Sequence, residues 1–170
     1  MNVMEAIRER KSIRSYESRP VEEEKLQAVL EAARLAPSAN NRQEWRYVVV
    51  RDQATRERLM VASNNQHFVA KAPVIIACCA QTDGRLLRCG QVAYTVDVSI
   101  SIDHMTLAAV ELGLGTCWIG SFYEDQVKEI LGIPEEIRVV ELLTLGYPAE
   151  PGRPRERKSL DEIVMYEKWG

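Results

Sequence analysis

Residues that bind metals or form disulfide frameworks are scarce in this sequence. It contains only two histidines and four cysteines, and no two cysteines have C-x-x-C spacing. Zinc sites are built from closely spaced cysteine and histidine, so we expect no metal site. Two of the cysteines lie within an apolar run, and we interpret all four as reduced thiols in the core of a cytoplasmic protein. They are Cys78, Cys79, Cys89 and Cys117.

Long uncharged apolar segments are also missing. The most apolar long stretch, residues 92–112, contains Asp97, Asp103, His104 and Glu111, which a bilayer helix rarely tolerates. Residues 1–20 hold no apolar run typical of a secretory signal. The net charge of −3 argues against a nucleic-acid partner, which usually requires a strongly basic face. We therefore expect neither a membrane nor a nucleic acid as partner.

What is present is an alternation of helical and strand patterns over 170 residues, a length typical of one domain. The alternation predicts an α+β fold with three layers, α/β/α. The helix expected over 91–112 is apolar on nearly all sides, so we expect a second subunit to cover part of it. Helices are predicted at 2–10, 21–36, 53–60, 91–112, 124–131 and 160–169. Strands are predicted at 45–51, 72–80 and 137–148, with a further short strand within 113–122.

Four segments carry residues that could do chemistry. The first is "RERKSIRSYES" (8–18), where arginine forks and a serine hydroxyl suit a phosphate, although such clusters are more often a solvated helix end. The second is "PSANNRQEW" (37–45), whose amides suit the edge of a heterocycle or simply form a turn. The third is "GLGTCWIGSF" (113–122), where glycines permit close approach to a flat ligand or cap a helix. The fourth is the basic tail, which could bind an anion or be disordered.

Taken together and in this order, these segments resemble the FMN-dependent nitroreductase family in its compact, short-chain form. The resemblance rests on "RKSIR" (10–14), "PSANNRQEW" (37–45), "GLGTCWIG" (113–120) and Arg157-Lys158 before the last predicted helix. It implies one FMN-binding domain, 1–170, with a small, mostly antiparallel central sheet flanked by helices. It also implies a homodimer with the long central helix at its interface, two non-covalent FMN molecules between the subunits, and a C-terminal arm, about 147–170, that extends over the partner.

The resemblance assigns site residues one by one. Those near the FMN phosphate and ribityl chain are Arg10, Lys11, Ser12 and Arg14, with Arg157 and Lys158 from the tail. Those that approach the cofactor from the partner subunit are Pro37, Ser38, Ala39 and Asn41, and Gln43 belongs to the same cofactor site. Those near the flavin ring are Asn65, Ile119, Gly120 and Ser121. A backbone N–H near Gly120 would point at flavin N5, so no side chain is assigned as catalytic.

The sequence departs from the family pattern at three places. Lys11 stands where arginine is frequent, and Glu44 where proline is frequent. The long insertion that covers the active site in larger relatives is missing, and we hypothesise that 81–91 serves as a mobile lid instead.

The activity implied by the resemblance is that of an FMN-dependent oxidoreductase. NAD(P)H would reduce FMN, and after the first product leaves, a nitroaromatic, quinone or similar small acceptor would be reduced in a ping-pong scheme. One alternative is a reductive dehalogenase or another flavoprotein fed by a protein electron donor. Others are a non-enzymatic flavin carrier or sensor, and a relative that has lost its flavin.

Overall fold

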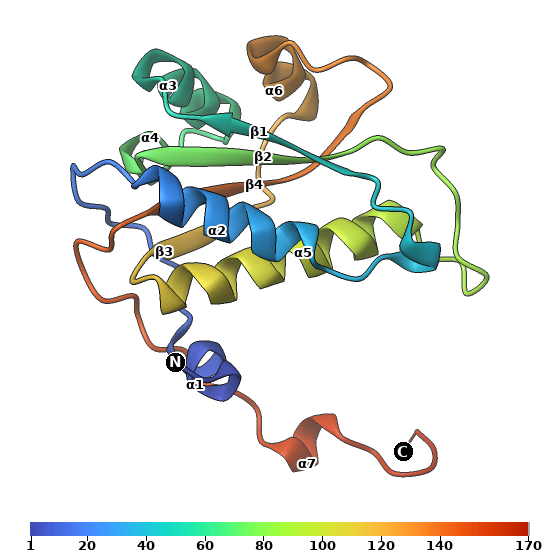
Figure 1. Cartoon of the computed structure of the whole chain (residues 1–170). Helices are drawn as coiled ribbons and strands as arrows, with labels where there is room; N and C mark the ends of the chain where they lie inside the picture. Colours follow the sequence, from blue (N-terminus) through green and yellow to red (C-terminus); the bar gives the residue numbers. More distant parts are fainter. Residues whose placement is uncertain (170) are drawn as a thin grey trace.

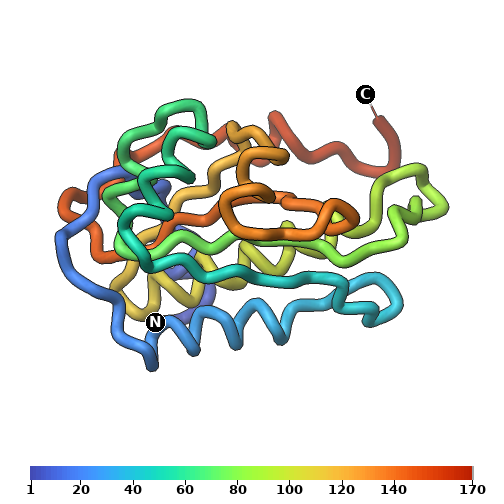
Figure 2. Tube along the Cα trace, turned by 90° about the horizontal axis from the view of Figure 1, so that it is seen from above, coloured from blue at the N-terminus to red at the C-terminus, as the bar shows by residue number. Residues whose placement is uncertain are grey.

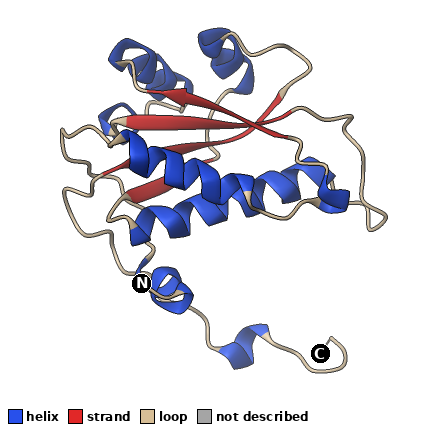
Figure 3. Cartoon of the chain, in the orientation of Figure 1, coloured by secondary structure: helices blue, strands red, loops and turns tan. Residues whose placement is uncertain are grey.

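The computed structural model of the protein describes residues 1–169. Figure 3 shows its helices and strands. The helices are α1 (Val3–Glu9), α2 (Glu23–Arg34), the 3₁₀ turn η1 (Ala39–Asn41), α3 (Gln53–Ala62), α4 (Phe68–Lys71), α5 (Ala93–Glu111), α6 (Glu124–Leu131) and α7 (Leu160–Ile163). The strands are β1 (Trp45–Val50), β2 (Val74–Ala80), β3 (Gly115–Ile119) and β4 (Arg138–Gly146).

The strands form a single sheet with the order β1-β2-β4-β3, and every neighbouring pair is antiparallel. Helices α2 and α5 cover one face of the sheet, and α3, α4 and α6 cover the other (Figure 1). The predicted α+β class, its three layers and its small antiparallel sheet are therefore confirmed.

The centre of the sheet is its most apolar part. All seven residues of β2 are buried, as in a strand that is covered on both faces. Side chains alternate between the two faces, so Ile76 packs toward α2 and α5 while Ile75 and Ala77 pack toward α3 and α6. Figure 2 shows α2 alongside α5 at one side of the sheet. Helix α5 lies within one residue or two of its predicted bounds.

Local sequence signals explain where several helices begin. The Asn2 side chain accepts a hydrogen bond from the Glu5 N–H at 3.0 Å, and the Glu5 side chain accepts one from the Asn2 N–H at 2.9 Å, which together form a capping box for α1. Asp52 caps α3 through the Thr55 N–H at 2.8 Å. Gly132 ends α6 in the left-handed region at φ 63°, where glycine avoids a side-chain clash.

Two expectations are wrong. The last helix covers only Leu160–Ile163, not 160–169, although a capping box between Ser159 and Glu162 favours a helix that starts here. No neighbouring element covers this segment within residues 1–169, so its apolar side chains have no surface that would hold a longer helix. Cys89 is exposed, not a core thiol, whereas the other three cysteines are buried.

The chain after β4 leaves the body of the protein and runs past α1 as an extended arm (Figure 1). Within residues 1–169, no helix combines the length and the apolar character that a membrane span needs. The same residues hold no cluster of side chains suited to a metal ion.

Candidate functional site

A basic pocket of about 560 Å³ brings together two segments from opposite ends of the sequence. One segment follows α1, and the other is the start of the C-terminal arm. The lining residues are Arg10, Lys11, Ser12, Arg14, Ser15, Glu150, Pro151, Gly152, Arg153, Arg155 and Arg157. Six of these side chains are cationic and one is a carboxylate, so the pocket favours a small anion with more than one charge.

Close backbone contacts bring the two segments beside β3. The Ile13 N–H donates to the Thr116 carbonyl at 2.8 Å. A β-carbon at position 115 would lie 2.4 Å from Ile13 Cγ1, and one at position 152 would lie 2.7 Å from Lys11 Cβ. Gly115 and Gly152 therefore permit an approach that a larger residue would block.

The six cations of the pocket have no ionic partner among the residues that the structure describes. The ion pairs formed within residues 1–169 include none of them. A group of unpaired cations raises the local positive potential, and a bound phosphate would lower it. The pocket thus has the charge and the donors for a phosphate group.

A second set of predicted residues lies beyond β3, on the side of α3 and α4. The guanidinium of Arg14 lies 5.7 Å from the centre of the Phe68 ring, which connects the basic pocket to α4. The Gln66 side chain donates to the Ser121 carbonyl at 3.3 Å. Asn65, next to Gln66, has a φ of 57°. Asn65 and Ser121 therefore lie in neighbouring segments at one end of β3.

The glycine at the end of β3 faces a carboxyl group. A β-carbon on Gly120 would lie 3.2 Å from Glu141 Oε1. Glu141 comes from β4, and burial raises its pKa to about 7. The sequence contains one signal for this residue, an acid within the apolar run "VVELLTLG", which our sequence analysis did not use.

The loop 37–43 lies far from the basic pocket of its own subunit. The Ala39 N–H donates to Asp97 Oδ1 in the first third of α5 at 3.1 Å. Lys11 and Ile13 lie in a groove with Val110, near the other end of that helix. Val110 comes thirteen positions after Asp97 in the sequence, which corresponds to about 20 Å of helix. One chain therefore does not bring Pro37, Ser38, Ala39, Asn41 and Gln43 to the basic pocket.

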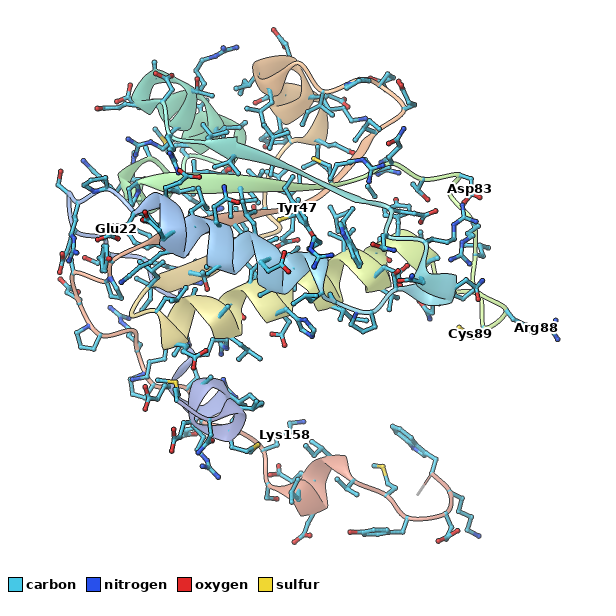
Figure 4. All side chains as sticks on the ribbon, in the orientation of Figure 1. Glu22, Tyr47, Asp83, Arg88, Cys89 and Lys158 are labelled. Carbon is cyan, nitrogen blue, oxygen red and sulfur yellow. The ribbon has the colours of Figure 1, made fainter. Side chains whose placement is uncertain are left out.

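The remaining predicted residues fall into three groups. Arg10, Lys11, Ser12, Arg14 and Arg157 line the pocket. Ile119, Gly120 and Ser121 end β3 and follow it. Lys158 lies at the start of the last helical segment and does not line the pocket (Figure 4).

The structure also brings residues to these positions that the resemblance did not assign to the cofactor. Arg153 and Arg155 line the pocket, and both belong to the basic tail that the sequence offered as a possible anion site. Phe68 beside Arg14 has no sequence signal, because the contact depends on how α4 packs.

The segment 81–91, the hypothesised lid, is attached at its beginning. The Gln81 N–H donates to the Glu44 carbonyl at 2.8 Å, and Arg42 pairs with Asp83 at 2.8 Å. Its tip, with Arg88 and Cys89, projects away from the body (Figure 4). A lid could therefore move only at the tip unless these contacts break, and its role stays a hypothesis.

Comparisons with known proteins find a family model and relatives that carry nitroreductase names. The family model "Putative TM nitroreductase" matches residues 2–169. A protein of Methanothermobacter thermautotrophicus named "Putative NADH dehydrogenase/NAD(P)H nitroreductase" is 37% identical over 174 residues, covering 99% of this chain and 88% of the relative.

Solved structures agree with this match. A nitroreductase family protein from Clostridium difficile has a TM-score of 0.89 and 35% identity, covering 99% of this chain and 100% of that chain. The NADPH:FMN oxidoreductase from Vibrio harveyi, complexed with NAD+, has a TM-score of 0.91 and 26% identity, covering 100% of this chain and 79% of that one. By sequence over nearly its whole length and by fold, the chain belongs to the nitroreductase family.

Proposed function

We propose that this protein is an FMN-dependent oxidoreductase that uses NAD(P)H as electron donor and acts as a homodimer. The observation that carries the proposal is the basic pocket, where six cations from both ends of the sequence, none of them ion-paired within residues 1–169, surround one cavity. The names of the relatives support the same chemistry, since one is an NADPH:FMN oxidoreductase.

The residues present fit FMN. Its phosphate would lie in the basic pocket, held by Arg10, Lys11, Ser12 and Arg157, with Arg14 nearer the ribityl chain or the ring. Asn65, Ile119, Gly120 and Ser121 would contact the ring. When bound, FMN supplies a carrier for two electrons, and the protein supplies position and electrostatics.

Gly120 is the residue assigned to the reacting part of the ring. It is exposed and carries no side chain, so its backbone N–H is accessible to a flat ligand. A fixed N–H donor there would orient the cofactor toward the nicotinamide. The open site would then admit the acceptor after the oxidised nicotinamide leaves, in a ping-pong order, with nitroaromatics and quinones as the acceptor classes.

A second copy of the chain would complete the site. The loop with Pro37, Ser38, Ala39, Asn41 and Gln43 is about 20 Å of helix away from the pocket in its own subunit, so we assign it to the flavin of the partner. The exposed apolar side chains of the arm support a partner surface: Leu160, Ile163, Tyr166 and Trp169 are 72%, 56%, 83% and 89% exposed. In this arrangement residues 1–170 are one domain, and the arm of about 147–170 lies over the partner.

The test is the visible absorption spectrum of the purified protein, followed by anaerobic addition of NADH and then NADPH. We expect a flavin spectrum that bleaches with one or both nucleotides. A flavin spectrum that persists with both, but bleaches with a low-potential protein donor, would support the protein-fed alternative. Slow reduction by every donor would support a carrier or sensor. A protein that stays colourless after FMN is added would overturn the proposal.

A further inference from the structure

Both polar backbone groups of Ala39 are held by charged side chains. Its N–H donates to Asp97 Oδ1 at 3.1 Å, and Arg85 Nη2 donates to its carbonyl at 3.2 Å. Asp97 belongs to α5, and Arg85 belongs to the segment 81–91. A carboxylate and a guanidinium from two separate elements thus hold one residue of the loop 37–43.

This arrangement is costly for the fold itself. Asp97 is only 3% exposed, yet its second oxygen has no hydrogen-bond partner within residues 1–169, and neither has the buried Nε of Arg85. No ion pair joins Asp97 to Arg85 in that part of the chain either. Burying charged groups with incomplete partners lowers stability, and apolar residues of similar size would cost less. The stability of the fold therefore does not explain why both charges are here.

The loop that they hold has an unusual backbone. Asn40, Asn41 and Gln43 have φ values of 55°, 55° and 53°. Residues other than glycine rarely adopt this region, and they keep it only when surrounding contacts fix them. Inside the loop, Ser38 Oγ accepts from the Gln43 N–H at 3.0 Å. Charged side chains attach this strained turn to the rest of the protein through the two bonds to Ala39 and through the ion pair of Arg42 with Asp83.

We propose that Asp97 and Arg85 are positioning residues that fix the loop 37–43 in the form in which it contacts the flavin of the partner subunit. The inference rests on the proposed function, which places that loop at the partner's cofactor. Asp97 holds the peptide group before Ala39 and Arg85 holds the peptide group after it, so together they fix the backbone of the loop on both sides of this residue. Neither side chain needs to touch the cofactor.

The first experiment compares FMN dissociation constants of the holoenzyme and three variants. Asp97→Ala removes the acceptor, and we expect FMN to bind about tenfold more weakly, the effect of one lost charge-assisted hydrogen bond. Asp97→Asn keeps an oxygen acceptor for the Ala39 N–H and should restore affinity to within about threefold of wild type. Arg85→Ala, in a partly exposed segment that the core does not require, should weaken binding by about threefold to tenfold.

The matched control is Asp125→Ala, an exposed acid on α6 that should leave FMN affinity unchanged. Circular dichroism melting shows which variants are folded. If Asp97→Ala does not fold, the FMN affinities of Arg85→Ala and Asp97→Asn still test the positioning role. Wild-type affinity in Arg85→Ala together with tenfold weaker binding in Asp97→Asn would overturn the positioning role.

The second experiment tests whether the loop 37–43 contacts the cofactor of its own subunit or that of the partner. A mixed dimer is prepared from one Asp97→Ala chain and one Arg10→Ala chain with different affinity tags. If the loop acts on the partner's cofactor, one site receives both defects and the other receives none. We expect one FMN per mixed dimer at wild-type affinity. Two weakened sites, each with one of the two defects, would mean that Asp97 acts within its own subunit and would overturn the inference.

These outcomes separate the inference from the function on which it rests. A wild-type protein that does not bind FMN would refute the proposed function. A wild-type protein that binds FMN, with Asp97→Ala and Arg85→Ala binding it equally well, would refute only the role of these two residues.

Discussion

The carboxyl group of Glu141 fills the space beside Gly120, where a β-carbon would lie 3.2 Å from Oε1. Burial raises the pKa of this carboxyl from 4.5 to about 7. Between pH 4.5 and about pH 7, therefore, the Glu141 carboxyl keeps its proton in the folded protein but has lost it in the unfolded chain. Stability that is present below pH 4.5 is lost as the pH rises to about 7.

Glu141→Gln should remove this pH dependence. The neutral amide has nearly the shape of the protonated acid, so we expect wild-type stability at pH 5. At pH 8 the variant should be more stable by about 1–2 kcal/mol, a value reduced for partial screening by solvent. Urea unfolding at the two pH values measures this difference. Glu129→Gln, exposed on α6, is the control, and a gain of equal size at both pH values would contradict the explanation.

Tyr147→Phe should lower the free energy of unfolding at neutral pH and have a smaller effect at acidic pH, because Tyr147 holds the carboxylate of Glu22. The Tyr147 hydroxyl donates to Glu22 Oε2 at 2.5 Å, and this bond lowers the pKa of Glu22 to about 2. A lowered acid pKa contributes stability above the ordinary value of 4.5, and that contribution disappears as the pH falls toward 2. We expect the variant to be less stable than wild type at pH 7 and the gap to narrow at pH 3. Tyr123→Phe, at an exposed position with no side-chain hydrogen bond among residues 1–169, should show no gap.

Gly115→Ala should destabilise the fold by about 1–3 kcal/mol, as overpacking usually does. The new methyl group would lie 2.4 Å from Ile13 Cγ1 and 2.9 Å from Ile13 Cβ. Removing Cγ1 in the double variant Ile13→Ala, Gly115→Ala should recover part of the loss, so the two changes should not be additive. Thermal unfolding of the four proteins of this cycle tests it. If the losses of stability from the two single changes add up exactly in the double variant, Ile13 is not the side chain that the new methyl group clashes with.

Arg10→Ala should weaken FMN binding by about 1.5–3 kcal/mol, the range for a hydrogen bond to a charged group. Arg10 lines the basic pocket and forms no ion pair with any residue of 1–169, so its guanidinium is free to bind the phosphate. Fluorescence titration with FMN gives the dissociation constant. Arg58→Ala, on the exposed side of α3, serves as the control for a change of charge. Equal affinities for Arg10→Ala and wild type would exclude the pocket as the phosphate site.

Replacing Leu160, Tyr166 and Trp169 by serine should raise the dissociation constant of the dimer at least about tenfold. Each of these side chains would lose apolar contact with the partner, and burying one large apolar side chain is worth about 1.5–3 kcal/mol. Sedimentation velocity over a range of concentrations measures the change. Serine at the exposed Val61 and Tyr123 is the control. A dimer of unchanged strength would place the interface elsewhere.

Much of the fold was predictable because local signals and burial agree. The apolar run 74–80 has strand composition, and the sheet covers it on both faces. The end of the chain shows the opposite case. Residues 160–169 have apolar side chains in a helical pattern, but no surface within residues 1–169 covers them, so only Leu160–Ile163 is helical.

The candidate site was predictable only where its residues lie together in the sequence. The segment 10–14 holds three cations and a serine hydroxyl next to one another, so it could be assigned to a phosphate from the sequence and the family resemblance. Glu141 beside Gly120, and Arg85 with Asp97 around Ala39, are contacts across long sequence separations. No spacing rule along the chain reveals such contacts, since they depend on the register of strands and on the path of loops.

The separation between the loop 37–43 and the basic pocket has a thermodynamic consequence. On the proposed arrangement, a lone subunit holds only part of each site, so the cofactor binds the assembled pair more tightly than the single chain. By mass action, FMN would then stabilise the pair, and dilution of the protein would weaken its apparent hold on FMN. Assembly and cofactor retention would behave as one linked equilibrium, in which the supply of flavin sets the fraction of chains that are paired.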